Sequence, residues 1–227
     1  MKQVVVLTGA SSGLGKEIAK QLLLKGKYQL ILTGREEKGF AEFKKSPDVT
    51  IVLGDLTKKT TIDLLKKEVK KHGRIDILIN NAGIIYINPF NENTEQKIDD
   101  LLAVDLKTPM LLTQRLYPFM VKQQSGHIIN INSTAGKDAK VNHTMYSAAK
   151  FGLKGFTDAL RIEAKLHNIR VTGFHPGGMN TEFYDDLPGT PKEKYMDPKK
   201  IAEILVQLIE TDPSISPDEI VINRMTR

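Results

Sequence analysis

Apolar and polar positions alternate along the chain in two repeating patterns. Short apolar runs rich in β-branched residues predict seven β-strands, at residues 3–8, 28–33, 49–53, 75–80, 127–132, 169–175 and 219–224. Between them, apolar residues recur at helical spacing and predict helices at about residues 13–26, 36–45, 60–71, 94–122, 146–167 and 199–210. Pro109 is expected to disturb the fourth of these helices, and Pro118 lies near its end.

This alternation of strands and helices is typical of a parallel sheet that helices cover on both faces. The expected fold class is therefore α/β. Residues 1–227 are expected to form a single domain, because no linker, repeat or low-complexity segment divides them. The longest stretch without periodicity, at about residues 177–198, is expected to be a substrate loop.

The composition narrows the classes of protein that the chain can belong to. Its 40% hydrophobic and 26% charged residues are those of an ordinary globular protein. The chain has no cysteine, which excludes disulfide bonds and thiolate metal sites, and no metal site is expected. The start lacks the long apolar stretch of a signal peptide, and no run reaches the roughly 18 apolar residues of a membrane span. We therefore expect a cytoplasmic protein without membrane attachment.

A net charge of +6 raises the question of nucleic-acid binding. The lysines come as scattered doublets, most of them interleaved with apolar residues at helical spacing, and no aromatic residues accompany them. This pattern favours solvated helix faces over a polyanion site. Nucleic acid is therefore not an expected partner.

The first predicted strand ends in the segment TGASSGLG, with Gly9, Gly13 and Gly15 between a strand and a helix. This context favours a dinucleotide phosphate loop, in which glycines permit a tight turn and the helix directs its free N–H groups at the phosphates. A plain glycine-rich turn is the alternative, and the strand before it and helix after it argue against that reading.

The end of the second predicted strand bears on the choice of cofactor. A carboxylate expected there would bind the ribose of NAD, but Gly34 and Arg35 occupy the region. An arginine can bind the 2′-phosphate of NADP, so NADP(H) is favoured. Glu36 could still turn inward, so NAD(H) remains possible, and Arg35 could simply be solvated. After the third strand, Asp55 is placed to accept a hydrogen bond from an adenine amino group.

Five motifs occur in order along the chain: TGASSGLG, NNAG at residues 80–83, Ser133 followed thirteen residues later by Tyr146, the Tyr-x-x-x-Lys pair of Tyr146 and Lys150, and PGGMNT at residues 176–181. With them, the chain resembles the short-chain dehydrogenase/reductases (SDRs), in their compact single-domain branch, over essentially its whole length. The resemblance implies a Rossmann-type doubly wound sheet of strand order 3-2-1-4-5-6-7. It also implies hydride transfer between a nicotinamide and a carbonyl or alcohol, and a homodimer or homotetramer.

The resemblance also implies which residues form the site. Ser133, Tyr146 and Lys150 would be catalytic; Lys150 would also bind the nicotinamide ribose, and Thr181 would hold the carboxamide. The expected cofactor-binding positions are Gly9, Ser11, Ser12, Gly13, Leu14, Gly15, Arg35, Asp55, Leu56, Asn81, Ala82, Gly83, Tyr146, Lys150, Pro176, Gly177, Met179 and Thr181.

The chemistry of the tyrosine–lysine pair can also be argued directly. Residues four apart share a helix face, so Lys150 is expected beside Tyr146, where its charge would lower the pKa of the phenol. Ser133 can orient a substrate oxygen toward that phenol. Outside this set of motifs, such a pair would be ordinary helix surface. His175 is interpreted as a packing residue at a strand end, and a substrate contact of His143 is left open.

One position departs from the family pattern. Where the family usually has asparagine in a segment like V-N-x-x-G, this chain has VDLKT, with Asp105 and Thr108. Aspartate can make similar local backbone contacts, but its carboxylate adds negative charge near the site. The hypothesis is that Asp105 raises the pKa of Tyr146. A weakened catalyst is the alternative that this departure leaves open.

These observations predict an NADP(H)-dependent oxidoreductase acting on a small carbonyl or secondary alcohol, with Tyr146 as general acid/base. The alternative is a dinucleotide-binding protein of the same fold that serves as a sensor or scaffold. The polar segment KDAKVNHTM before Tyr146 and the short loop at residues 185–195 favour a small polar carbonyl or hydroxy acid.

Overall fold

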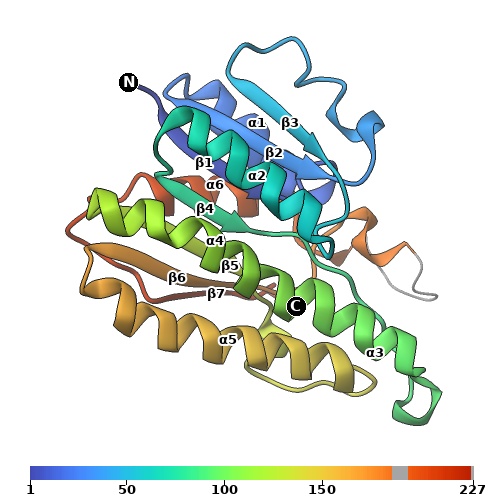
Figure 1. Ribbon diagram of the computed structural model, residues 1–227. Helices are drawn as coiled ribbons and strands as arrows, with labels where there is room; N and C mark the ends of the chain where they lie inside the picture. Colours follow the sequence, from blue (N-terminus) through green and yellow to red (C-terminus); the bar gives the residue numbers. More distant parts are fainter. Residues whose placement is uncertain (186–193, 226–227) are drawn as a thin grey trace.

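A computed structural model describes residues 1–185 and 194–225. Seven parallel strands form one sheet in the order β3-β2-β1-β4-β5-β6-β7 (Figure 1), which confirms the predicted strand order. The strands are β1 Gln3–Thr8, β2 Tyr28–Gly34, β3 Val49–Leu53, β4 Ile77–Asn80, β5 Gly126–Ile131, β6 Ile169–Pro176 and β7 Glu219–Ile222.

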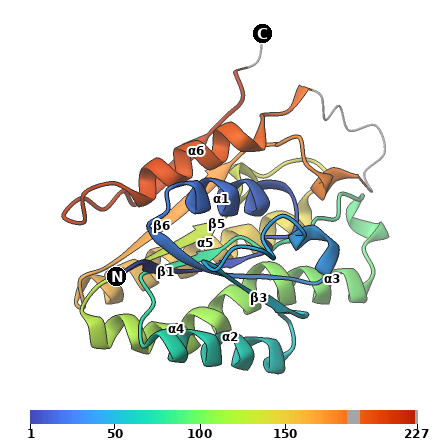
Figure 2. The ribbon, with the colours of Figure 1, turned by 90° about the horizontal axis from the view of Figure 1, so that it is seen from above.

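Helices cover both faces of this sheet. The α-helices are α1 Gly13–Leu24, α2 Lys59–His72, α3 Glu95–Leu102, α4 Thr108–Gln123, α5 Thr144–Lys165 and α6 Pro198–Ile209. Short 3₁₀ or π segments are η1 Glu37–Phe40, η2 Phe90–Glu92, η3 Ala103–Lys107, η4 Thr134–Gly136 and η5 Glu182–Tyr184. Helices α1 and α6 pack together on one face, and α2 and α4 lie on the other (Figure 2).

The alternation of side chains along β1 explains why the sheet needs helices on both faces. Val5 and Leu7 belong to the core beneath α1 and α6, whereas Val4 and Val6 belong to the core beneath α2 and α4. Successive strand residues point to opposite faces, so a strand that is apolar throughout must be buried on both sides. The central strands of this sheet are therefore held by two separate cores.

Helix α2 shows how the lysine doublets are accommodated. Its residues Ile62, Leu65 and Val69 are buried, while the lysines of the same helix are exposed. This is the amphipathic stripe that the sequence predicts. None of the helices in the described part of the chain is long and apolar enough to cross a membrane.

The helix predicted at residues 36–45 is wrong. Only η1, Glu37–Phe40, is helical there, and turns follow it. Phe40 and Phe43 are buried in the core beneath α1, and a Cβ on Gly39 would come within 2.4 Å of the Ser11 carbonyl oxygen. The segment is thus held close against the loop after β1, and this tertiary packing outweighs its local preference for helix.

The disturbance expected from Pro109 is confirmed and takes a specific form. The predicted helix at residues 94–122 is divided into α3, the π-helical segment η3 and α4, with Pro109 in the first turn of α4. Proline has no N–H to offer the carbonyl four residues earlier, and its ring crowds that carbonyl. The carbonyl that loses its hydrogen-bond donor in this way is that of Asp105, which lies in η3. A π segment at this point is consistent with such a break in the α-helical ladder.

The predicted substrate loop at residues 177–198 is described in part, because residues 186–193 lie outside the described residues. The two ends of the loop are joined by backbone hydrogen bonds. Met196 N–H donates to the Gly178 carbonyl at 3.1 Å, and Asn180 N–H donates to the Met196 carbonyl at 2.9 Å. These bonds hold the start and end of the loop beside the carboxyl end of β6.

Candidate active site

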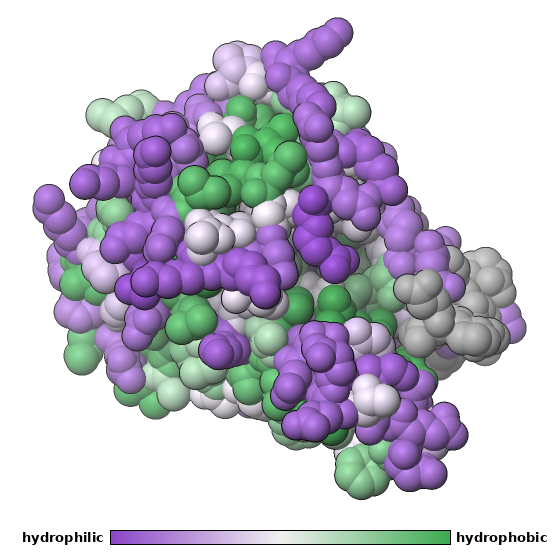
Figure 3. Space-filling view, turned by 45° about the vertical axis from the view of Figure 1, so that its right-hand side comes forward, coloured by the Kyte–Doolittle hydropathy of each residue, from purple (hydrophilic) through white to green (hydrophobic). Residues whose placement is uncertain are grey.

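The carboxyl ends of the strands border a cavity of about 590 Å³. Figure 3 shows this side of the molecule, where hydrophilic residues surround a hollow. Every residue that the sequence assigns to the cofactor lines this cavity, and so does Ser133. Asp105 is the exception among the expected site residues, since it is fully buried and does not line the cavity.

The glycine loop is shaped for close approach of a ligand. Gly9 has φ +64°, a left-handed conformation that favours glycine, and a Cβ there would lie 2.8 Å from the Cα of Ala82. A Cβ on Gly15 would lie 2.2 Å from the Gly9 carbonyl oxygen. Both glycines are therefore required for the path of the backbone in this loop.

The loop after β4 clamps the glycine loop in place. The Asn81 side-chain amide donates to the carbonyls of Thr8, at 2.8 Å, and Gly9, at 3.1 Å. The backbone N–H groups of Asn81 and Ala82 both donate to the Thr8 hydroxyl at 2.9 Å. Asn81 thus has a structural role that connects the first and fourth strands at the floor of the cavity.

The N-terminus of α1 opens into this cavity at Gly13, Leu14 and Gly15. The first N–H groups of a helix have no partner within the helix, and the helix dipole makes this end positive. The first turn of α1 has no acidic residue. The glycine turn leaves no room for a side chain, and the N-terminus of α1 is positive. Together they fit the pyrophosphate of a dinucleotide.

Polar groups beside β2 and β3 line the far end of the cavity. Arg35 is exposed and lines the cavity, and its charge contributes to a lowered pKa of Asp55. The largest cause of that lowered pKa is the hydrogen bond from Thr57 N–H, at 2.9 Å. Glu36, by contrast, pairs with Lys38 at 2.8 Å and does not line the cavity.

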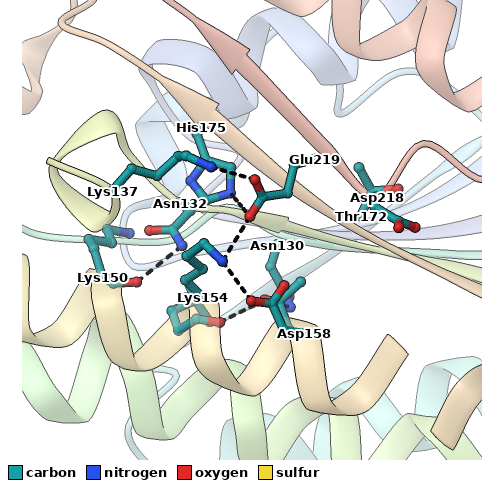
Figure 4. A network of polar contacts seen from close by, with 12 residues as sticks. Asn130, Asn132, Lys137, Lys150, Lys154, Asp158, Thr172, His175, Asp218 and Glu219 are labelled. Atoms are coloured by element: carbon teal, nitrogen blue, oxygen red, sulfur yellow. Dashed lines mark hydrogen bonds and ion pairs between the residues drawn. The ribbon is translucent and has the colours of Figure 1, made fainter. Parts of the chain in front are cut away.

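Ser133 is held from behind by buried groups. Its backbone N–H donates to the Asn132 side chain at 3.0 Å, and Asn132 in turn donates to the Lys150 carbonyl at 3.1 Å (Figure 4). Nδ1 of His175 lies 3.3 Å from the Ser133 carbonyl oxygen. His175 is 1% exposed, as a packing residue at a strand end should be. The serine loop is therefore fixed relative to α5.

Tyr146 and Lys150 lie one turn apart on α5, and both are buried. Nζ of Lys150 is 5.6 Å from the centre of the Tyr146 ring. Burial raises the pKa of Tyr146, the negative charge of Asp105 raises it further, and the nearby Ser133 hydroxyl opposes both effects. The net pKa of Tyr146 is thus raised, because burial and Asp105 outweigh the lowering effect that the sequence leads us to expect from Lys150.

A network of ion pairs supports the same helix one turn further along (Figure 4). Lys154, one turn after Lys150, pairs with Asp158 at 2.6 Å and Glu219 at 3.0 Å. Glu219 also pairs with Lys137 at 2.5 Å, and these contacts lower its pKa to about 2. The network connects β7, α5 and the residue that follows η4.

Several residues that line the cavity are absent from the sequence prediction. Ile84, Ile85 and Tyr86 directly follow the NNAG motif, and Phe183 and Tyr184 directly follow Thr181 and Glu182. The ring of Phe183 lies 6.4 Å from that of Tyr146 and 5.3 Å from that of Tyr184. Their adjacency to two motifs was a usable signal, because a loop that carries a motif into a cavity brings its next residues with it.

Comparisons with known proteins agree with this geometry. The family model described as short chain dehydrogenase matches residues 3–191. An uncharacterised oxidoreductase of Staphylococcus saprophyticus is 33% identical, with 97% of this chain and 96% of that protein covered. A sepiapterin reductase of Chlorobaculum tepidum is 30% identical over 100% of this chain and 97% of that protein. The crystal structure of a metagenomic short-chain oxidoreductase in complex with NADP has a TM-score of 0.84 and 28% identity, covering 99% of this chain and 98% of that one. The chain therefore belongs to the short-chain dehydrogenase family.

Proposed function

We propose that the protein is an NADP(H)-dependent oxidoreductase that interconverts a small carbonyl compound and its alcohol. The observation that carries the proposal is the placement of Ser133, Tyr146 and Lys150 in one cavity with the glycine loop. When bound, the nicotinamide supplies or accepts the hydride. The protein's own task is then to position the substrate oxygen and to move one proton.

Each catalytic residue has a task that follows from its surroundings. Ser133 and Tyr146 line the same cavity, so their hydroxyls can receive one substrate oxygen together. Tyr146 donates its proton to this oxygen during reduction and takes it back during oxidation. Lys150 supplies a fixed positive charge beneath the ring of Tyr146.

The residues of the cavity also fit a dinucleotide cofactor. The glycine loop and the N-terminus of α1 would hold the pyrophosphate, and Asp55 and Leu56 would hold the adenine end. Arg35 supports NADP(H) over NAD(H), because a guanidinium can bind a 2′-phosphate. The pairing of Glu36 with Lys38 keeps that carboxylate engaged elsewhere. The metagenomic relative in complex with NADP supports the same choice.

Replacing Arg35 by Ala is expected to weaken NADPH binding by about 10- to 100-fold, the loss that one or two hydrogen bonds to a charged group produce. Affinity for NADH should remain within about twofold of the wild type, because the two cofactors differ only in the 2′-phosphate. The measurement is the dissociation constant of each cofactor by thermal shift. Lys44→Ala, which removes an exposed cation outside the cavity, is the control. Equal weakening of both cofactors, or tighter NADH than NADPH binding by the wild type, would contradict this assignment.

The lining beside Tyr146 supports an apolar, aromatic substrate. Tyr146 packs with Leu101 and Ala135, and partly buried side chains of Ile84, Tyr86 and Phe183 surround them. Among the described residues that line the cavity, the only cations are Arg35, at the far end, and Lys150. Lys150 already pairs with Asp105 at 3.0 Å.

This lining differs from the small polar substrate that the residues before Tyr146 indicate. The aromatic side chains of Tyr86 and Phe183 beside Tyr146 favour a flat, apolar molecule. Among the described lining residues near Tyr146, no cation is left to pair with an acid group of the substrate. The cavity of about 590 Å³ must also hold the cofactor, so the substrate has to be small. We propose a small neutral aromatic aldehyde or ketone. Sepiapterin, for which the Chlorobaculum tepidum relative is named, is one candidate to test.

A further inference from the structure

Asp105, which lies behind the wall of the cavity, forms an ion pair with Lys150, which lines the cavity. Oδ2 of Asp105 lies 3.0 Å from Nζ of Lys150, and their side chains are 0% and 5% exposed. The two residues come from different elements, since Asp105 lies in η3 and Lys150 in α5. A pair this deeply buried is little screened by solvent or salt.

The same carboxylate also holds the loop that lines the cavity. Oδ1 of Asp105 accepts the N–H of Ile84 at 2.8 Å, and a Cβ on Gly83 would lie only 3.1 Å from Oδ2. Nζ of Lys150 has a second contact, with the Ile131 carbonyl at 3.3 Å. Asp105 therefore positions both the NNAG loop and the catalytic lysine without touching the cavity itself.

This pairing changes what Lys150 can do for Tyr146. A lone ammonium beside a phenol favours the phenolate, which is the form that accepts a proton from an alcohol. Here a full negative charge lies 3.0 Å from that ammonium, so the pair as a whole is neutral. Burial raises the pKa of Tyr146, and Asp105 raises it further. Near neutral pH, the phenol accordingly keeps its proton.

We propose that the buried Asp105–Lys150 pair makes Tyr146 a proton donor near neutral pH, so that the site is suited to carbonyl reduction and oxidises alcohols only at alkaline pH. In reduction, the phenolic O–H bond breaks and an O–H bond forms on the substrate oxygen; Tyr146 later recovers a proton from water. The equilibrium between carbonyl and alcohol is unchanged. Asp105 acts through Lys150 and Tyr146, so it is a positioning residue. This inference rests on the proposed function.

Other titratable groups near Tyr146 have to be separated from this effect. His143, at the start of α5, has its ring 6.3 Å from that of Tyr146. Tyr184 of η5 interacts with Tyr146 electrostatically, and Tyr86 lies in the same apolar cluster. Of these, the histidine is the side chain that can carry a positive charge, so His143→Gln is included as a second control.

The test is Asp105→Asn, which keeps the side-chain shape and an oxygen for the Ile84 N–H. Protein labelled with ¹³C at Cζ of tyrosine is titrated by NMR without cofactor, and the Tyr146 signal is the one missing from Tyr146→Phe. We expect Tyr146 to lose its proton at a pH lower by about one unit or more in Asp105→Asn. The acidic limb of the pH profile for benzyl alcohol oxidation should move the same way.

Asp76→Asn is the matched control. Asp76 accepts the Val4 N–H at 2.7 Å and pairs with Arg74 just before β4, at the end of the sheet opposite the cavity. Its loss should lower stability and leave the Tyr146 titration in place.

Two results would overturn the inference. One is an unchanged Tyr146 titration in Asp105→Asn, and the other is an equal shift in Asp76→Asn or in His143→Gln. Either would leave the proposed function standing as long as Tyr146→Phe remains inactive. A Tyr146→Phe variant as active as the wild type would instead remove the proposed function itself.

Discussion

Replacing Tyr146 by Phe is expected to lower the rate of carbonyl reduction by about 10²- to 10⁴-fold, the contribution of a positioned general acid. The phenylalanine ring preserves the packing against Leu101, Ala135 and Phe183. Only the phenolic hydroxyl is lost. The glycine loop and the N-terminus of α1, which would hold the pyrophosphate, lie away from α5, so the dissociation constant of NADPH should stay within about twofold of the wild type. The measurements are steady-state kinetics with benzaldehyde and a binding titration with NADPH.

The matched control for this prediction is Tyr117→Phe. Tyr117 lies on α4, where its ring contacts His167, and it does not line the cavity. Removing its hydroxyl is expected to leave kcat and KM unchanged. If Tyr146→Phe kept more than about a tenth of the wild-type rate, Tyr146 would not be the proton donor. Equal loss of NADPH binding would instead point to a disturbed fold.

Replacing Lys150 by Met is expected to remove activity and to lower the free energy of unfolding by about 3–5 kcal/mol, because it leaves Asp105 buried without its partner. Asp105 would keep only the Ile84 N–H, and it is fully buried. Urea unfolding followed by circular dichroism measures the change. Lys154→Met is the control one turn away: its ion pairs are partly exposed, so a loss of about 1 kcal/mol is expected.

The Lys150→Met variant should also respond to pH in a defined direction. Burial raises the pKa of the Asp105 carboxyl, and the charge of Lys150 opposes this effect. Without Lys150, the folded protein binds a proton at Asp105 more tightly than the unfolded chain, whose aspartates titrate at about 3.9. The difference in free energy of unfolding between the wild type and Lys150→Met should therefore become smaller as the pH falls from neutral toward 4 and larger as the pH rises.

A second variant shows whether the buried charge is the cause. Adding Asp105→Asn to Lys150→Met removes the unpartnered carboxylate and should restore part of the lost stability. Two results would contradict a stabilising pair at this position. One is a double variant whose loss in free energy of unfolding equals the sum of the two single losses, and the other is a loss in Lys150→Met that does not change with pH.

Much of the fold follows from local pattern. Residues of β1 alternate between two cores, so a strand apolar at every position already predicts helices on both faces. The segment at residues 36–45 shows where this reasoning stops. Its charged, periodic residues favour a helix, but the burial of Phe40 and the contact of Gly39 with Ser11 decide its path. Both contacts are with residues distant in sequence, which a local pattern cannot reveal.

The site was predictable to a similar extent. The positions expected to bind the cofactor, together with Ser133, line one cavity because each motif follows a strand whose carboxyl end borders it. The pairing of Lys150 with Asp105 joins positions far apart in sequence, so the sequence indicates a nearby charge but not a contact of 3.0 Å. Phe183 and Tyr184 were missed, although their position directly after the PGGMNT motif was a usable signal.

Hydride transfer itself is the most direct test of the proposed activity. The protein is incubated with NADPH that carries deuterium in place of the transferable hydride, and benzaldehyde, sepiapterin and pyruvate are offered as carbonyl probes. Mass spectrometry then measures the deuterium content of each alcohol product. We expect one deuterium in the product of an aromatic carbonyl, formed faster than from pyruvate, and at least a hundredfold less product with Tyr146→Phe. NADPH binding without transfer of deuterium to any of these carbonyls would contradict the proposal and favour a dinucleotide-binding sensor or scaffold.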